Sequence, residues 1–287
     1  MLRVFQSNRL EILADELALA LARGEAPALE SQKIVVQERG VARWLQLELA
    51  RRQGIAANIE FPFPAGLIWS LFTRVLPQVP LESPFEPDVL VWRFMKWLER
   101  SKAASHPRLK HALAEGDARR RYELAQRLAQ VFDRYLVYRP QWMQAWSEDK
   151  KLGLGPDEAW QAAFWRELSE ELRPDQRKHP KDEFFAALEK DMVARAALPQ
   201  SLHLFAIQAL PPMYVDIFRR LAEWIDIHLY VLNPCEEHWG DIVTNRELAL
   251  QAAQNSQSAD LHFEVGNALL ASLGRQGRTF IDSLSEA

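Results

Sequence analysis

Hydrophobic positions follow two different periods in the first 80 or so residues. Short apolar runs typical of buried strands alternate with segments in which leucine and other apolar residues recur every three or four positions. The predicted strands are LRVFQ (2–6), KIVVQ (33–37) and ANIEF (57–61). The predicted helices span about 9–23, from Val41 to near Gly54, and about 65–76. This alternation of strand and helix indicates a parallel sheet covered by helices.

The strand pattern stops between about residues 84 and 199 and then returns. The intervening segment is predicted to be helical over 86–101, 106–114, 117–136, 140–147, 157–172 and 181–196. Strands follow at 202–207 and 225–232, on either side of a helix that starts near Pro211. We therefore predict an α/β fold with a parallel Rossmann-like sheet, in which an α/β domain (1–84 and 199–287) is interrupted by a helical insertion (85–198).

Composition indicates the cellular location of the chain and the kind of surface it has. Cys235 is the only cysteine among 287 residues, and no apolar run is long enough to span a membrane, so we expect a reducing, cytoplasmic location and no membrane partner. The net charge of −4 argues against a protein with a basic surface all over. A local basic groove stays possible, because arginine outnumbers lysine 26 to 9.

The loop after the first strand is where a nucleotide-binding protein of this architecture places its phosphate loop. Here it reads Gln6-Ser7-Asn8-Arg9, with neither the glycine nor the lysine that cradle phosphates. The strand at 202–207 is followed by Gln208-Ala209-Leu210-Pro211, without the carboxylate that would hold Mg²⁺. We therefore expect the scaffold of a nucleotide-hydrolysing enzyme without its chemistry or its cofactors.

Other candidate sites are weaker. Cys235 and His238 form a C-x-x-H beside acidic residues, but no second cysteine or close histidine pair completes a four-ligand zinc set. Gly153 and Gly155 form a G-x-G that no strand precedes, so a loop is the better interpretation. No serine or cysteine lies in a nucleophile motif.

Two patterns in the helical segment permit nucleic-acid binding without requiring it. A polar stripe on the helix 117–136 lies opposite the apolar face of Leu124, Leu128, Phe132 and Tyr135; the stripe residues are Arg120, Glu123, Arg127, Gln130 and Arg134. Such a stripe is usually a solvated face. Several of the ten tryptophans form near-neighbour pairs; most are expected in the core, although a few beside an arginine-rich groove would stack on bases.

Several longer strings are more specific. LRVFQSNRLEIL, GIAANIEFPFPAGLIW, FDRYLVYRPQW, IQALPPMY, HLYVLNPCEEHWGDI and NALLASLGRQGRTFI occur in one register from Met1 to the end of the chain. Together they resemble the RecC family, the gamma subunits of exodeoxyribonuclease V (RecBCD). The resemblance covers about the N-terminal quarter of the length of that family's members, and the ending at SLSEA suggests a truncated chain.

The resemblance implies a degenerate superfamily 1 helicase-like fold, with helicase-like domain 1A interrupted by a 1B-like insertion. It implies a subunit that is not itself an enzyme and needs no cofactor, in a heterotrimer with RecB-like and RecD-like subunits. Such a subunit splits duplex DNA ends, guides the single strands and scans one of them for the recombination signal Chi. The implied DNA-binding residues are Gln37, Arg39, Arg43, Phe63, Trp69, Gln130, Val131, Asp133, Arg134 and Arg139. Amide, guanidinium and carboxylate groups can engage base edges, and aromatic rings can stack on bases.

The chain departs from the family pattern at three of these positions. Arg39 replaces a threonine, Arg43 a glutamine and Gln130 an aspartate. Each change adds positive charge or exchanges an acceptor for a donor, so we expect a different signal octamer, or tighter binding with less discrimination. Two other hypotheses about the function stay open. The chain could be an α/β enzyme that binds a small nucleotide at an unusual loop, or a docking module whose surface binds only proteins.

Overall fold

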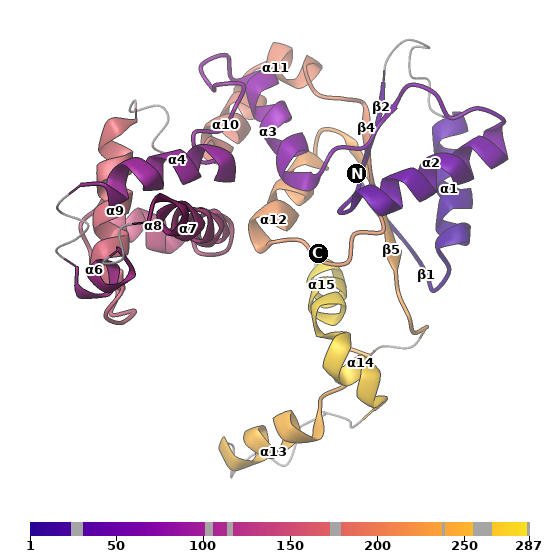
Figure 1. Ribbon diagram of the computed structural model, residues 1–287. Helices are drawn as coiled ribbons and strands as arrows, with labels where there is room; N and C mark the ends of the chain where they lie inside the picture. Colours follow the sequence, from indigo (N-terminus) through magenta and orange to yellow (C-terminus); the bar gives the residue numbers. More distant parts are fainter. Residues whose placement is uncertain are drawn as a thin grey trace. The chain divides into compact units, whose positions relative to one another are not determined.

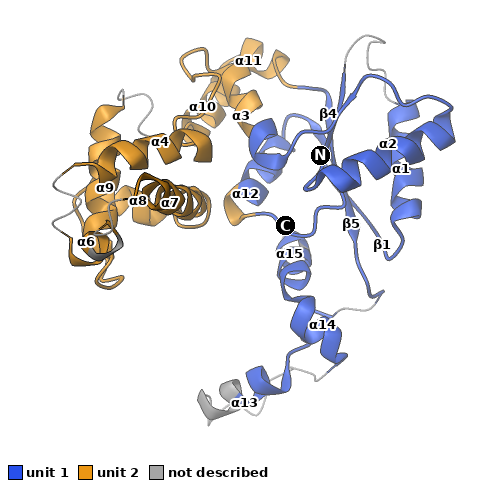
Figure 2. Ribbon diagram, viewed as in Figure 1, with its two compact units in different colours: residues 1–67, 199–210, 214–287 blue, residues 68–198, 211–213 orange. Residues whose placement is uncertain are grey.

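The computed structural model describes residues 1–23, 31–100, 106–113, 117–172, 179–236, 239–254 and 266–285 (Figure 1). The chain forms two compact units (Figure 2). Unit 1 comprises residues 1–67, 199–210 and 214–287, and unit 2 comprises 68–198 and 211–213.

Unit 1 is built on a five-stranded sheet in which all neighbouring strands are parallel. The strands are β1 (Leu2–Ser7), β2 (Gln32–Val35), β3 (Ile59–Glu60), β4 (Ser201–Phe205) and β5 (Asp226–Leu232). Their order across the sheet is β1-β5-β4-β2-β3. The predicted α/β fold with a parallel sheet is confirmed, and the predicted strands differ from the observed ones only at their ends.

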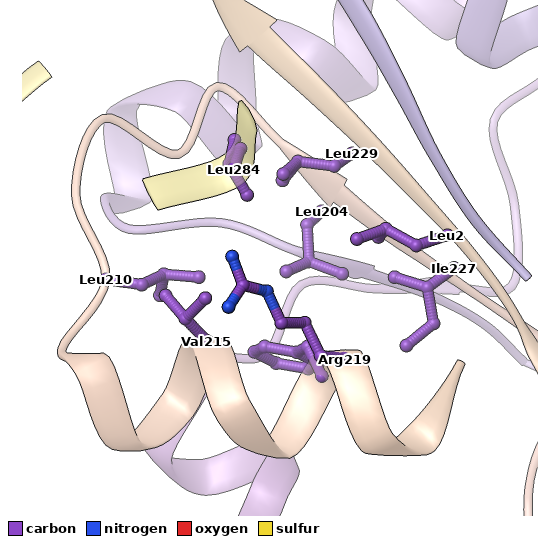
Figure 3. A pocket seen from close by; sticks show the side chains of 9 residues that line it. Leu2, Leu204, Leu210, Val215, Arg219, Ile227, Leu229 and Leu284 are labelled. Atoms are coloured by element: carbon purple, nitrogen blue, oxygen red, sulfur yellow. The ribbon is translucent and has the colours of Figure 1, made fainter. Parts of the chain in front are cut away.

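Helices cover both faces of this sheet (Figure 1). On one face lie α1 (Leu10–Arg23) and α2 (Arg39–Gln53), whose Leu17 and Leu45 pack in one buried cluster with Tyr230 of β5. Against the other face lie α12 (Pro212–Leu221) and α15 (Arg275–Ser285), which enclose a small apolar pocket with the sheet (Figure 3). The C-terminal part also holds α13 (Asn245–Gln254) and α14 (Ala268–Leu273). The sequence analysis predicted none of the helices after β5.

The connections change direction between β2 and β4. The chain moves one way across the sheet from β1 to β2 to β3, and the opposite way from β3 to β4 to β5. Because crossover connections are right-handed, the helix after β2 and the helix after β4 cover opposite faces. The carboxyl ends of these neighbouring strands therefore form a topological switch point, which is where open α/β sheets bind their ligands.

Unit 2 consists of helices and connecting loops, without a strand among its described residues. Its helices are α3 (Pro64–Val75, which begins in unit 1), α4 (Pro87–Leu98), α6 (Pro107–Leu113), α7 (Ala118–Tyr138), α8 (Pro140–Ser147), α9 (Glu158–Glu171), α10 (Lys181–Lys190) and α11 (Met192–Ala196). Three phenylalanines from α4, α7 and α9 meet at its centre, and the rings of Phe94 and Phe164 stack with centroids 3.7 Å apart. Phe132 packs edge-on against both rings.

Two loops of unit 2 show how side chains set the ends of its helices. The single helix predicted over 181–196 is wrong, because the chain breaks at Asp191, whose carboxylate accepts a 2.8 Å hydrogen bond from the Val193 amide and caps α11. The segment with Gly153 and Gly155 is a loop, as predicted. Both glycines have positive φ, at 74° and 112°, which a residue with a side chain rarely adopts.

The same loop wraps around the buried carboxylate of Glu158. That group accepts hydrogen bonds from the Leu152 amide at 2.6 Å, the Leu154 amide at 2.9 Å and the Trp146 indole at 3.1 Å. These donors hold the pKa of Glu158 below its usual value, led by the bond from Leu152. Glu158 therefore stays ionised and fixes the loop against the helical core.

Candidate nucleic-acid interface

Gln37 lies at the switch point, two residues after β2. Its Oε1 accepts a 3.0 Å hydrogen bond from the Gln208 amide, and its Nε2 donates to the Ala209 carbonyl. Both partners belong to the loop after β4, some 171 residues later in the chain. Both ends of the Gln37 amide are thus used to join the two loops at the carboxyl edge of the sheet. In this geometry Gln37 positions the edge, and its exposed amide keeps a second N–H and a second lone pair with which it could contact a base.

Arg39 and Arg43 follow directly, on the first turns of α2. Both side chains are exposed, and their spacing of four places them on the same face of the helix. Among the described residues, neither guanidinium has a hydrogen-bond or ion-pair partner. The preceding Glu38 makes no side-chain cap. Free backbone N–H groups and two free guanidinium groups at one helix N-terminus favour a phosphate or another anion.

Phe63 lies beside this edge, after β3. The Val36 amide donates to the Pro62 carbonyl at 3.1 Å, which keeps the ends of β2 and β3 side by side. The Phe63 ring is 43% exposed, unlike most aromatic rings of the chain. Gln37, Arg39, Arg43 and Phe63 therefore gather at one edge of unit 1.

Trp69 lies on the part of α3 that belongs to unit 2 and is more constrained than predicted. Its indole N–H donates to the Pro80 carbonyl at 3.0 Å, and its ring packs edge-on against Phe72. The ring is half-buried, so part of its surface stays accessible for stacking.

The remaining predicted residues lie on α7 and at its end. Gln130 and Arg134 are exposed, whereas Val131 and Asp133 are half-buried. Burial raises the pKa of the Asp133 carboxyl, and the neighbouring Arg134 partly opposes that rise. Burial has removed water from the Asp133 carboxyl. A base amino group that donates a hydrogen bond to this carboxyl would replace the lost water.

Arg139 forms the junction between α7 and α8. Its amide donates to the Tyr135 carbonyl at 2.8 Å, its carbonyl accepts from the Trp142 amide at 2.9 Å, and its guanidinium lies 5.6 Å from the centre of the Trp142 ring. The guanidinium also donates to the Tyr138 carbonyl at 3.0 Å. The side chain is exposed but oriented, so it can present its remaining N–H groups to a phosphate.

The polar stripe of α7 faces solvent as predicted. All five stripe residues are exposed, while Leu128 and Phe132 on the opposite side are buried. The exposed charged residues of α7 are Arg119, Arg120, Arg127, Arg134 and Glu123. Four cations against one carboxylate make this helix face attractive to a polyanion, even though the whole chain is acidic.

The prediction that most tryptophans fill cores is confirmed, with one clear exception. Trp97, Trp146, Trp160 and Trp165 are buried in unit 2, whereas Trp92 of α4 is 66% exposed. The sequence analysis counted Trp92 among the near-neighbour pairs, with Trp97, but did not separate it from the buried tryptophans. The available signal is its position outside the apolar stripe of α4, since its neighbours Leu90, Val91 and Phe94 are all buried.

The other loops at the carboxyl edge hold amide and hydroxyl groups. After β1, the Ser7 hydroxyl accepts a 3.1 Å bond from the Arg9 backbone amide. The side-chain oxygen Oε1 of Gln6 accepts a 2.8 Å bond from the side-chain Nδ2 of Asn233, which follows β5. Among the described residues, no three histidine, cysteine or acidic side chains converge as a metal site. Cys235 is half-buried, and His238, the other residue of the C-x-x-H string, lies outside the described residues. No helix in the described ranges is long and apolar enough to cross a membrane.

Comparison with known proteins identifies the family. Residues 2–287 match the family model described as "RecC, N-terminal domain". The chain belongs to the RecC family. The chain is 36% identical, over its whole length, to the RecBCD enzyme subunit RecC of Escherichia coli (strain K12). It is 32% identical over 97% of its length to the same subunit of Haemophilus influenzae, and 31% identical over 96% of its length to that of Mycolicibacterium smegmatis.

The chain matches only part of these relatives. It spans 28% of the Escherichia coli subunit, 30% of the Haemophilus influenzae subunit and 25% of the Mycolicibacterium smegmatis subunit. The predicted membership of the RecC family is therefore confirmed. The prediction that the resemblance covers about a quarter of the length of a RecC subunit is confirmed as well.

Proposed function

We propose that this RecC-family chain is a non-catalytic, DNA-handling part of a RecBCD-type helicase–nuclease that repairs double-strand breaks by homologous recombination. In this role it binds single-stranded DNA at the carboxyl edge of the unit 1 sheet and along α7 of unit 2. It thereby helps to split duplex ends, to guide one strand and to recognise Chi. The observation that carries the proposal is the pair of exposed arginines, Arg39 and Arg43, at the N-terminus of α2 beside the switch point. Within the described ranges, neither guanidinium has a hydrogen-bond or ion-pair partner.

Each group of residues has a distinct chemical part in this proposal. Arg39 and Arg43 bind phosphate or a base edge, and Phe63 stacks on a base. Gln37 holds the loops after β2 and β4 together and so fixes the direction in which α2 presents its arginines. On unit 2, Gln130, Val131, Asp133, Arg134 and Arg139 contact the strand, and the free part of the Trp69 ring packs against it.

The proposal treats residues 1–84 and 199–287 as a helicase-like domain 1A and residues 85–198 as its 1B-like insertion. Its partners are RecB-like and RecD-like subunits in a heterotrimer, because the relatives are named as subunits of the RecBCD enzyme. The complex supplies the hydrolysis of ATP and of DNA in the cytoplasm. In support, the loop at Ser7–Arg9 has no lysine, and the loop at Gln208–Pro211 has no carboxylate.

The proposal includes an altered specificity for the signal octamer. Arg39, Arg43 and Gln130 differ from the family pattern, and the first two add positive charge at one edge. In a Chi-scanning assay on the assembled enzyme, we expect Arg39→Thr/Arg43→Gln/Gln130→Asp to shift the response toward the familiar signal. A wild-type enzyme that responds only to that familiar signal would remove this part of the proposal.

The DNA-binding claim is tested by fluorescence anisotropy of a labelled single-stranded oligonucleotide across a salt series. Arg39→Ala/Arg43→Ala is compared with Arg3→Ala/Arg23→Ala, which removes the same charge from two exposed arginines at the opposite, amino edge of the sheet. We expect affinity to fall with salt, and the slope of log affinity against log salt to become shallower by about 1.4 in the first variant only. Equal effects of both variants would show that net charge alone drives binding.

A further inference from the structure

Trp92 and Tyr122 form an exposed aromatic pair where α4 packs against α7. Their ring centroids lie 6.0 Å apart, and the ring planes meet at 48°. Trp92 is 66% exposed and Tyr122 is 37% exposed, so each ring keeps free surface. The other nine tryptophans are all buried or half-buried, which makes Trp92 the one indole of this chain that is offered to solvent.

Packing within unit 2 does not account for this pair. The buried face of α4 is formed by Leu90, Val91, Phe94 and Trp97, and Trp92 lies outside it. Full burial of a side chain of this size contributes several kcal/mol to the stability of a fold, so an indole left mostly in water contributes little of that to this one. The exposed indole is therefore available to a binding partner.

The pair is continuous with the α7 face that carries Gln130 and Asp133. At 100° per residue, Tyr122, Gln126 and Asp133 project within about 40° of one another, on the flank of the helix between its buried face and its polar stripe. Tyr122 and Asp133 are eleven residues apart, which corresponds to about 16 Å along the axis. The Gln126 side chain bridges toward the pair, because its Nε2 donates to the Tyr122 hydroxyl at 3.3 Å.

The charge of the surroundings indicates the kind of partner. Exposed arginines outnumber exposed carboxylates four to one on α7. Lys96 of α4, one turn beyond Trp92, is exposed, with its ammonium group 3.8 Å from Glu171. A chain that alternates flat apolar rings with negative charges matches this alternation of aromatic and basic side chains. An apolar protein surface would not match the positive charge of this helix face.

We propose that Trp92 and Tyr122 form a base-stacking platform that extends the single-stranded DNA path along α7, beyond the residues that read the signal. This inference rests on the proposed function, since it lengthens the same path. The platform stacks one base on the free face of the Trp92 indole without reading its identity, and the arginines of α7 hold the flanking phosphates. It sets the position of the strand and leaves sequence recognition to Gln130 and Asp133.

The test uses the whole chain and the salt-series anisotropy assay, with Trp92→Ala, Trp92→Tyr and the control Met192→Ala, which removes another exposed apolar side chain of unit 2. We expect Trp92→Ala to weaken binding about tenfold at every salt concentration with an unchanged slope, because no charge is lost. We expect Trp92→Tyr to recover most of the affinity and Met192→Ala to bind as the wild type does.

The outcomes separate this inference from the proposed function. If Arg39→Ala/Arg43→Ala weakens binding while Trp92→Ala does not, the platform is refuted and the proposed function stands. In that case, loss of assembly with RecB-like and RecD-like subunits in Trp92→Ala would assign the pair to a protein interface. If the wild-type chain binds no single-stranded DNA at low salt, both claims fail. A Trp92→Ala variant with a changed salt slope would also refute stacking as the mechanism.

Discussion

Replacing Gln37 by alanine tests whether this side chain positions the carboxyl edge or reads a base. The substitution removes both hydrogen bonds that join the loops after β2 and β4. A hydrogen bond contributes about 0.5–1.5 kcal/mol, and at this exposed site water partly replaces each lost bond. We therefore expect the substitution to destabilise the arrangement in which the two loops are joined by about 1–2 kcal/mol, relative to one in which they separate.

Hydrogen exchange measures this loss locally, because the Gln208 amide itself donates to Gln37. In native-state exchange, a loss of about 1.4 kcal/mol gives about tenfold faster exchange in peptides that cover residues 206–210. Gln37→Glu keeps the acceptor for Gln208 but sets a carboxylate oxygen against the Ala209 carbonyl, so it should also speed the exchange of this loop. Gln46→Ala, at an exposed glutamine of α2, is the control and should leave the exchange of the loop at 206–210 unchanged.

One result would refute the reasoning. If Gln37→Ala leaves the exchange of residues 206–210 unchanged but weakens binding of single-stranded DNA tenfold, the amide contacts the DNA directly and does not act through the loop. If exchange and affinity change together, Gln37 acts as a positioning residue.

Three further predictions concern stability and nucleotide binding. His203 is buried beside His228 in the sheet, and burial lowers the pKa of His203 to about 4. Because the unfolded chain takes up this proton near pH 6.5, the free energy of unfolding should fall by about 3 kcal/mol between pH 6.5 and pH 4. Urea unfolding of His203→Leu should lose that part of the pH dependence. Glu158→Gln leaves a loop amide without its acceptor, so thermal unfolding of unit 2 should shift down by several degrees. ATP with Mg²⁺ should not shift the melting temperature, and a shift of several degrees would favour a nucleotide-binding enzyme instead.

Local patterns were sufficient to predict much of the fold. The alternation of strand and helix periods predicted the parallel sheet, and Gly54, at φ 81°, ends α2 as expected of a glycine after a helix. The stripe of α7 was predicted because amphipathic spacing depends only on neighbours along the chain. The helices after β5 were not predicted, and the break at Asp191 was missed because polar capping competes there with an uninterrupted helical pattern.

The candidate site depends more on contacts between distant parts of the chain. The exposure of Arg39 and Arg43 follows from their place on α2, but the partners of Gln37 lie 171 and 172 residues away and leave no signal in its own segment. The indole bond of Trp69 to Pro80 and the exposure of Trp92 likewise depend on which helix faces pack together. A single sequence specifies such pairings only through the complete fold.

The central claim, a DNA path at the carboxyl edge of the sheet and along α7, is tested most directly by photo-cross-linking. The whole chain is irradiated with a single-stranded oligonucleotide that carries 5-iodouracil, and the modified peptides are identified by mass spectrometry. We predict cross-links within residues 37–43 and 61–69 and on α4 and α7, at Trp92, Tyr122 or the segment 130–139. Cross-links confined to the amino edge of the sheet, around Arg3 and Arg23, or no cross-links at low salt, would contradict the account.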